Sequence, residues 1–446
     1  MVKVITYGTF DFFHYGHRRL LERAKALGDY LIVGVTADDF DKMRGKINVQ
    51  QSLIERIEAV RASGLADEII VEEYEGQKID DIKRFGVDIF TIGSDWVGKF
   101  DYLNEYCKVI YQDRTEGVSS SEIRAQKREI TLGFVGESPA MNKFIAECDY
   151  VNGIKIGGLC SLDSTAYEEN LSKFPFVTNR YEDLIDKVDA VYILSHPSKH
   201  YEQIKLALSR HKHVLCESPL ALDKSQCEEL LLMAKEQHCV LYEAIKTAYF
   251  TAYSRLLLLA KGGKIGRVVS VDSVCTSLRK IDTTNADKVS LTWSSLEGWG
   301  PTALLPIFQL LGTKYIQKRM VSLVADGTEK FDEFTAISFV YPHAVASIKV
   351  GKGVKSEGEL IISGTEGYIY VPAPWWKTDY FEIRYENAEH NKRYFYQLDG
   401  EGIRYEIVAF LKALEGRSVG YVTEDISVAI AQIMEDYAAE NDVVRI

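Results

Sequence analysis

The sequence predicts an α/β protein in which two parallel sheets follow one another and a strand-rich part ends the chain. Over roughly the first 130 residues, short apolar runs alternate with segments of helical spacing. A fresh alternation begins at Ile130–Gly136, and strand patterns dominate from about residue 250. Because 446 residues exceed the size at which one core usually keeps growing, we expect separate domains at 1–129, 130–250 and 251–446.

Five apolar runs of the first part read as strands of one parallel sheet. They are Val2–Ile5, Tyr30–Val35, Glu68–Val71, Val87–Ile92 and Lys108–Tyr111. Ligands of such sheets bind outside the carboxyl ends of the strands, and polar clusters follow several of these runs. We therefore expect the functional site at that edge.

The stretch Tyr7–His17 joins the first strand to a helix predicted over Arg18–Leu27. A strand, a glycine-bearing turn and a helix start form an anion site, because unpaired amides and the positive end of the helix dipole meet there. His14 and His17 are three residues apart, so both can face one side and donate hydrogen bonds to phosphate oxygens. The alternative interpretation is two histidines that only cap or pack the turn.

A second polar cluster, Arg114–Ser121, follows the fifth run, and Ser94-Asp95-Trp96 follows the fourth. A guanidinium, several hydroxyls and a glycine before a helix start suit a triphosphate. A serine-rich helix cap would explain Ser120 or Ser121, but it would not explain the Arg-Thr-Glu-Gly that precedes them.

Three ordered motifs, GTFDFFHYGH, GKFD after Trp96, and RTEGVSSS, resemble the HxGH nucleotidyltransferases, in particular the glycerol-3-phosphate cytidylyltransferase family, over roughly residues 1–128. The resemblance implies a Rossmann-like fold, catalytic roles for His14, His17, Lys46 and Arg114, and an acceptor-phosphate site at Arg44 and Lys78. The spacing from Arg44 to Arg56 departs from the family pattern by about one residue. The resemblance further implies that CTP, with Mg²⁺, contacts Gly8, Thr9, Phe10, Asp11, Gly16, Asp95, Thr115, Ser119, Ser120 and Ser121.

The implied reaction is in-line attack of a polyol phosphate oxygen on the α-phosphorus of CTP, with pyrophosphate as leaving group. It needs no protein nucleophile. The product would be a CDP-polyol, which we expect to serve cell-envelope polymer synthesis. Asp11 has two open interpretations, a metal or ribose contact and a turn-stabilising carboxylate. The metal ligands are otherwise left unassigned by the sequence.

The rest of the chain resembles the Gfo/Idh/MocA oxidoreductase family over about residues 131–440. The likeness is carried by Val191–Tyr201, His213–Leu220, Glu243-Ala244 and Gly364–Gly367. It implies a second Rossmann-like domain followed by an α+β domain with an open sheet. It also implies an NAD(P) site at Gly133, Gly136, Ser161, Pro197 and Glu217, to which we add Lys246 as a candidate.

The chain departs from this second family at its chemical residues. Ser138 and Met141 stand where the dinucleotide fingerprint has glycines, and Glu137 adds negative charge near a diphosphate. The family's Glu-Lys-Pro reads Glu217-Ser218-Pro219, and residues 298–306 contain no Asp, His or Tyr.

These departures predict weakened or absent nicotinamide binding. Lys246 could replace the missing lysine, or it could simply begin a solvated helix. Two roles therefore stay open, a reductase that makes the polyol phosphate and a cofactor-binding or dimerising module without chemistry.

Composition narrows the class of protein. A formal charge of −12 argues against nucleic-acid and anionic-membrane partners, and no apolar run approaches the length of a membrane span. Met1-Val2-Lys3 leads directly into a strand. The seven cysteines are scattered, which argues against a zinc site or a disulfide framework. We expect a cytoplasmic enzyme of small-molecule substrates that forms a homodimer or higher homo-oligomer.

Overall fold

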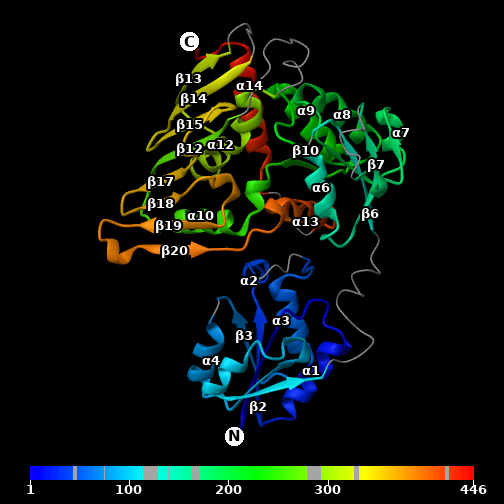
Figure 1. Cartoon of the computed structure of the whole chain (residues 1–446), viewed down its shortest axis with the longest axis vertical. Helices are drawn as coiled ribbons and strands as arrows, with labels where there is room; N and C mark the ends of the chain where they lie inside the picture. The colour runs from blue at the N-terminus through cyan, green and yellow to red at the C-terminus, as the bar shows by residue number, and fades with distance from the viewer. Residues whose placement is uncertain are drawn as a thin grey trace. The chain divides into compact units, whose positions relative to one another are not determined.

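The computed structural model describes the chain except residues 44–47, 75, 114–128, 139, 163–169, 279–292, 326–330 and 417–420. It divides into two compact units, Met1–Glu129 and Ile130–Ile446 (Figure 1). The finer boundary at residue 250 stays a prediction.

The first unit is built on a parallel sheet in the order β3-β2-β1-β4-β5. Its strands are β1 (Lys3–Gly8), β2 (Tyr30–Thr36), β3 (Glu68–Glu72), β4 (Ile89–Gly93) and β5 (Lys108–Gln112). Its helices are α1 (Tyr15–Lys25), α2 (Asp38–Met43), α3 (Leu53–Ala62) and α4 (Gln77–Phe85), with short turns η1 (Ser94–Trp96) and η2 (Asp101–Glu105). All five predicted strands are present.

The order of this sheet determines where a ligand can bind. The chain proceeds outward from β1 to β2 and β3 and then returns to place β4 on the other side of β1. The connections after β1 and β4 therefore leave in opposite directions, which opens a crevice at the carboxyl ends of these two strands. Val4, Ile5, Leu31, Ile32 and Val33 are fully buried, as expected for a sheet covered on both faces.

The second unit begins with a parallel sheet of order β11-β10-β9-β6-β7-β8, the order of a doubly wound dinucleotide-binding sheet. Its strands are β6 (Ile130–Val135), β7 (Ile154–Cys160), β8 (Val177–Thr178), β9 (Ala190–Ile193), β10 (His213–Glu217) and β11 (Leu241–Ala244). Its helices are α6 (Met141–Cys148), α7 (Tyr181–Ile185), α8 (Pro197–Ser209) and α9 (Lys224–Glu236). The predicted second α/β part is thus confirmed.

A large mixed sheet completes this unit, in the order β20-β19-β18-β17-β12-β15-β14-β13-β21, with β16 paired to β12. Its strands are β12 (Val268–Leu278), β13 (Gln317–Val324), β14 (Asp332–Val340), β15 (Val345–Gly351), β16 (Gly353–Val354), β17 (Leu360–Gly364), β18 (Tyr368–Val371), β19 (Tyr380–Arg384), β20 (Lys392–Phe395) and β21 (Val443–Arg445). The accompanying helical segments are η4 (Lys246–Tyr249), α10 (Thr251–Lys261), α12 (Ser295–Leu311), η5 (Trp375–Lys377), η6 (Ala388–His390), η7 (Gly400–Gly402), α13 (Ile403–Leu414) and α14 (Glu424–Ala438).

The C-terminal helices link the two sheets of the second unit. Helix α12 packs on β12 and β15, whereas α13 packs on α6 and α14 packs on both α9 and α12 (Figure 1). Ala431 of α14 belongs to the same buried cluster as Val191 and Val214 of the parallel sheet. The seven cysteines are free thiols. In the part of the chain that the structure describes, no helix combines the length and apolarity that crossing a bilayer requires.

Candidate functional site at the edge of the first sheet

The loop after β1 is folded around the ring of Phe10. Phe10 and Phe12 have left-handed backbone conformations, with φ of 56° and 49°, and Phe10 is buried. A Cβ at Gly8 would lie 2.9 Å from the Phe10 ring, so a side chain at this position would displace it. Gly8 and Phe10, both predicted to contact CTP, therefore shape the turn itself.

His14 and His17 cap α1 through one ring nitrogen each. Nδ1 of His14 accepts the Gly16 N–H at 3.1 Å, and Nδ1 of His17 accepts the His14 N–H at 3.4 Å. Because an accepting nitrogen carries no proton, each neutral ring bears its proton on Nε2. The two rings stack with centroids 3.8 Å apart. The two histidines can therefore cap the helix and still donate hydrogen bonds to a ligand. The caps use Nδ1 of each ring, and the two Nε2–H groups are donors at the start of the helix.

Arg56 of α3 holds the ends of β1 and β2 together. Its side chain is fully buried and donates to the carbonyls of Thr9 at 2.7 Å, Thr36 at 2.8 Å and Gln51 at 3.1 Å. Asp41 lies 3.6 Å from the guanidinium and accepts the Thr9 hydroxyl at 2.8 Å. Sequence reasoning used Arg56 only to judge spacing. Its role depends on carbonyls that come together only in the fold.

Asp11 supports the loop in the same region. Its Oδ1 accepts the backbone N–H groups of Gln50 at 3.1 Å and Gln51 at 2.9 Å, and the residue is 3 % exposed. These bonds tie the turn after β1 to the segment before α3. They favour the turn-stabilising interpretation of Asp11 over a metal contact.

Lys78 lies in α4 at the carboxyl end of β3. Its ammonium is paired with Glu72 and lies over the Tyr7 ring, 4.6 Å from the centroid. Glu72 also accepts the Thr36 hydroxyl at 2.9 Å, and Tyr7 donates to Asp81 at 2.9 Å. Lys78 is 8 % exposed, so a phosphate that binds it must share or replace the Glu72 contact.

The remaining predicted residues of this site divide into two groups. Gly16 is in the first turn of α1, and Asp95 lies in η1, directly after β4 and therefore beside the end of β1. Seven residues lie outside the described part of the chain: Arg44, Lys46, Arg114, Thr115, Ser119, Ser120 and Ser121. Arg23 of α1 donates to the Asp113 carbonyl at 2.6 Å, which anchors the chain just before the last five of them.

In the second unit, the backbone of the loop after β6 passes close to the backbone just after β9. Gly136 has φ of 125°, and a Cβ there would lie 2.5 Å from the Ser195 nitrogen. Gly133 lies in β6, where a Cβ would crowd Leu184 at 3.0 Å. Gly136 is therefore required by packing, and Gly133 has little room for a side chain. Ser161, just past β7, is buried, and Pro197 begins α8.

Glu137 of this loop is neutralised in part. Its carboxylate lies 3.8 Å from Lys199 of α8 and accepts the Leu162 N–H at 3.4 Å. The repulsion of a diphosphate that the sequence predicts is weakened by this lysine. The charge that the sequence predicts to oppose a diphosphate at this loop is therefore partly offset.

Ser218, which stands where the second family has a lysine, is part of the buried core. The Ser218 hydroxyl donates to Glu243 of β11, and both residues are buried. Burial raises the pKa of Glu243 above its usual value, against the bonds from Ser218 and Ser427. Ser218 is thus a structural partner.

Next to Ser218 in the chain, Glu217 forms a cluster with Tyr192 and Glu406 that holds a proton. Tyr192 of β9 donates to Glu406 of α13 at 2.8 Å and lies 3.4 Å from Glu217 of β10. Burial raises the pKa of both carboxyl groups well above the usual range of glutamate, although the charge of Lys246 opposes the rise. The pair therefore retains a proton near neutral pH. Sequence reasoning found Glu217 and Lys246 but missed Tyr192 and Glu406, since no motif connects such distant positions.

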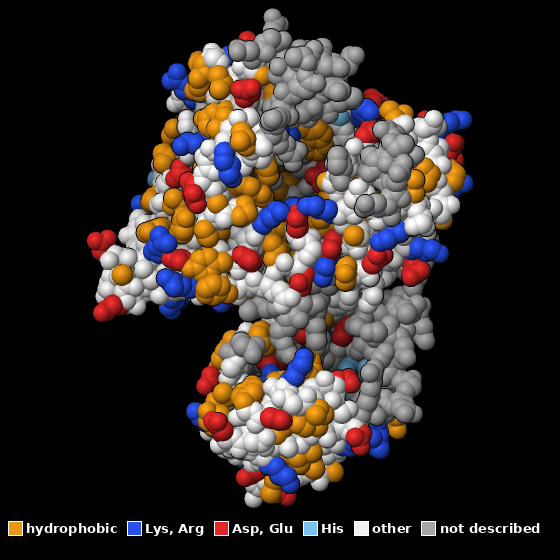
Figure 2. Space-filling model, viewed as in Figure 1, with side chains coloured by type: hydrophobic (Ala, Val, Ile, Leu, Met, Phe, Trp, Pro, Cys, Tyr) orange, Lys and Arg blue, Asp and Glu red, His pale blue; other side chains and the backbone are white. Residues whose placement is uncertain are grey.

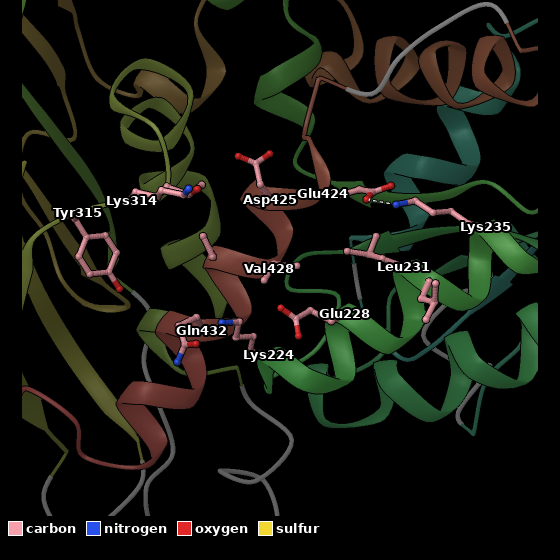
Figure 3. A pocket seen from close by; sticks show the side chains of 13 residues that line it. Lys224, Glu228, Leu231, Lys235, Lys314, Tyr315, Glu424, Asp425, Val428 and Gln432 are labelled. Carbon is pink, nitrogen blue, oxygen red and sulfur yellow. Dashed lines mark hydrogen bonds and ion pairs between the residues drawn. The ribbon is translucent and has the colours of Figure 1, made fainter.

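A pocket of about 600 Å³ lies among α9, α14 and the connection from α12 to β13 (Figure 3). Charged side chains of both signs line it, and its Lys235 and Glu424 pair at 2.6 Å (Figure 3). None of the predicted site residues is among its lining residues. Among the described residues, no group of three or more His, Cys, Asp or Glu could hold a metal ion.

Comparison with known proteins finds relatives of the first unit over nearly its whole length. Residues 5–126 match the cytidylyltransferase-like family. The glycerol-3-phosphate cytidylyltransferase of Bacillus spizizenii is 52% identical over 124 residues, which cover 28% of this chain and 95% of that protein. The chain belongs to the cytidylyltransferase-like family. The Bacillus subtilis glycerol-3-phosphate cytidylyltransferase is 45% identical over 126 residues, covering 28% of this chain and 97% of that enzyme. The first unit is thus a nucleotidyltransferase domain.

Residues 130–245 of this cytidylyltransferase-family chain match the oxidoreductase family with an NAD-binding Rossmann fold. The scyllo-inositol 2-dehydrogenase (NADP⁺) of Bacillus subtilis is 30% identical over 210 residues, covering 46% of this chain and 62% of that enzyme. A 3-ketoreductase from Actinomadura kijaniata, crystallised with NADP and TDP-benzene, has a TM-score of 0.62 at 17% identity and covers 72% of this chain and 100% of its own. At that identity the likeness establishes the fold alone.

Proposed function

We propose that the first unit transfers CMP from CTP to glycerol 3-phosphate or a related alditol phosphate, giving a CDP-polyol and pyrophosphate. The observation that carries this proposal is the pair of stacked histidines whose Nε2–H groups stand at the start of α1. They lie at the crevice between β1 and β4, in a domain half identical to a glycerol-3-phosphate cytidylyltransferase.

The proposed reaction is a single in-line displacement. An oxygen of the acceptor phosphate attacks the α-phosphorus of the magnesium complex of CTP, and the bond to the β-phosphate oxygen breaks to release pyrophosphate. The Nε2–H groups of His14 and His17 donate to phosphate oxygens on which charge grows, and the amides of α1 face the same region. Lys46 and Arg114 are proposed to contact the phosphates as well, on the strength of the family motifs alone.

The acceptor phosphate is proposed to bind at Lys78, with Arg44 as a second contact. Lys78 stands on the carboxyl edge of the sheet and already holds a carboxylate, Glu72. An arriving phosphate dianion competes with that carboxylate for the ammonium. Use of the CDP-polyol for cell-envelope polymers stays a prediction, as do the cytoplasmic location and the homo-oligomeric state.

Turnover of CTP by the purified full-length chain tests the proposal. Glycerol, ribitol and other alditol phosphates are offered alongside ethanolamine and choline phosphates, and CDP-linked product and pyrophosphate are quantified. We expect turnover with an alditol phosphate and far less with the amino-alcohol phosphates. Absence of CDP-linked product with every acceptor would refute the proposal.

For the second unit, we propose reduction of a carbonyl group in the sugar phosphate from which the polyol phosphate is made. The specific observation in its favour is the Tyr192–Glu406–Glu217 cluster beside Lys246, which holds the proton that carbonyl reduction consumes. Bound NAD(P)H would supply the hydride, and the loop at Gly136 would hold its diphosphate. The protein's part is to deliver the proton to the carbonyl oxygen.

Oxidation of NADPH or NADH by the full-length chain in the presence of ketose phosphates tests this second proposal. Turnover that is lost in Lys246→Ala supports the reductase. Cofactor binding without turnover on any ketose phosphate would instead support the module without chemistry.

A further inference from the structure

Three lysines of the second unit converge on one carboxylate. Lys143 of α6 and Lys377 of η5 both contact Oε1 of Glu401, at 2.9 Å and 3.0 Å. Lys246 of η4 lies 3.6 Å from Oε2 of the same residue. All four side chains are between 30% and 59% exposed, so solvent and small solutes reach the group. We call these four residues the lysine cluster.

The lysine cluster carries excess positive charge. Partial burial disfavours the ionised form of Glu401, but hydrogen bonds from Lys143 and Lys377 and the charge of Lys246 outweigh it and hold its pKa at about 2. One carboxylate therefore faces three ammonium groups at neutral pH. The Glu217–Glu406 pair near Lys246 adds less negative charge than two ionised carboxylates would, because it retains a proton near neutral pH.

The backbone holds the Glu401 carboxylate at this point. Gly400, Glu401 and Gly402 are all left-handed, with φ of 56°, 51° and 79°. A Cβ at Gly400 would lie 1.8 Å from a Glu147 oxygen, and one at Gly402 would lie 1.8 Å from the Phe250 ring, so both positions require glycine. Left-handed backbone at a residue with a side chain costs roughly 1 kcal/mol, and such residues gather at ligand sites.

The location is that of a ligand site in a parallel α/β sheet. Lys246 follows the carboxyl end of β11, and Lys143 lies in the first turn of α6, the helix after the Gly136 loop. On the face of the unit shown in Figure 2, lysine and arginine side chains gather around an acidic one over α6 and α13. Ligands of such sheets bind at this edge.

We propose that Lys143, Lys246 and Lys377 form a binding site for a dianionic phosphoryl group and that Glu401 occupies the place of its oxygens until the ligand binds. A carboxylate and a phosphate present similar acceptor oxygens to ammonium donors, and the dianion matches the excess charge. The phosphoryl group belongs to a phosphorylated sugar or to a nicotinamide dinucleotide. The inference extends the proposed reductase, but binding is measured without turnover, so the two can fail separately.

Residue-resolved lysine protection in the full-length chain tests the site without interference from phosphate binding in the first unit. The protein is acetylated briefly at rising inorganic phosphate, and modification of each lysine is quantified by peptide mass spectrometry. We expect Lys143, Lys246 and Lys377 to be protected at one shared phosphate concentration. Lys235, a lysine of the same unit that pairs with Glu424, is the control and should not change.

Two variants give opposite expectations. Glu401→Gln removes the competing charge, so the phosphate concentration for half-protection should fall about fivefold, the ratio for a contribution of about 1 kcal/mol. Lys377→Met should raise it by a similar factor. A cluster that only stabilises the fold would show no protection in the wild type and no shift in Glu401→Gln, and either result would overturn the inference.

Repeating the titration with glycerol 3-phosphate, a ketose phosphate, NADH and NADPH identifies the source of the phosphoryl group. Protection by the sugar phosphates at lower concentration than by inorganic phosphate assigns the site to the substrate. Protection by NADPH but not by NADH assigns it to the 2′-phosphate of the cofactor. Equal protection by unrelated anions such as sulfate and chloride would contradict a phosphoryl site.

Discussion

Replacement of His14 by asparagine separates the two roles that its ring plays. The amide oxygen of Asn stands near the place of Nδ1, so His14→Asn should still accept the Gly16 N–H and cap α1. It has no group at the place of Nε2. The variant therefore keeps the cap and loses the donor that the phosphate is proposed to meet.

The magnitudes follow from these two interactions. Loss of one donor to developing charge costs about 2.7–4 kcal/mol of transition-state stabilisation, or roughly 10² to 10³ in kcat. Asparagine is a favourable N-cap residue, so the stability of the first unit should be equal to or above that of the wild type. His14→Gln is the matched opposite, because its amide nitrogen lies near the place of Nε2 while the cap is lost. It should unfold more readily, by about 1 kcal/mol, and retain more turnover than His14→Asn.

Both quantities are measured on the full-length variants. Steady-state CTP turnover with glycerol 3-phosphate gives kcat, and hydrogen exchange of α1 peptides reports the stability of the cap. Near-normal turnover in His14→Asn would show that the histidine is only a cap. Turnover that follows cap stability across Asn, Gln and Ala would refute the assignment of the donor to Nε2.

Three further predictions concern the framework of the two units. Arg56→Met should destabilise the first unit by about 3–5 kcal/mol in chemical denaturation, because it leaves buried carbonyls and Asp41 without their cation. Arg56→Lys should restore only part of the lost stability, because an ammonium cannot make all the hydrogen bonds of the guanidinium. Unchanged stability in Arg56→Met would contradict the buried role. Gly136→Ala should destabilise the second unit by several kcal/mol, since its Cβ meets the Ser195 backbone; hydrogen exchange of β6 peptides checks this. Glu406→Gln should match the wild type at pH 4 and melt higher at pH 9, and equal melting at pH 9 would count against the raised pKa. Because the pKa of Glu406 is raised in the folded state, the wild-type contribution is complete below about pH 4.5 and is lost as pH rises through the folded-state pKa.

The motif around His14 shows how far the sequence alone could lead. The apolar run, the glycine and the helical spacing predicted a strand, a turn and a helix start, and the structure contains them at Lys3–Gly8 and Tyr15–Lys25. The three-residue spacing placed His14 and His17 together. The assignment of their ring protons was out of reach, because it depends on backbone N–H groups that the left-handed turn through Phe10 and Phe12 directs.

In the second unit, the sequence predicted the fold better than it predicted which charged side chains meet. The family motifs placed Glu217 and Lys246, but Glu401 and Glu406 stand in a late segment that no motif marks. Their partners on α6, β9 and η5 meet them only in the folded unit. The position of Glu137 in the sequence predicted repulsion of a diphosphate. The lysine that offsets this charge, Lys199, comes from α8 and meets Glu137 only in the folded unit.

The central claim is that the first unit makes a diphosphate bond between CMP and an alditol phosphate. The most direct measurement is ³¹P NMR of the purified full-length chain with CTP, Mg²⁺ and glycerol 3-phosphate. The account predicts that the phosphomonoester signal of the acceptor is replaced by the two coupled signals of an asymmetric diphosphate, with pyrophosphate formed in equal amount. Release of pyrophosphate or phosphate from CTP with the acceptor signal unchanged would contradict the account, because it would show hydrolysis without transfer.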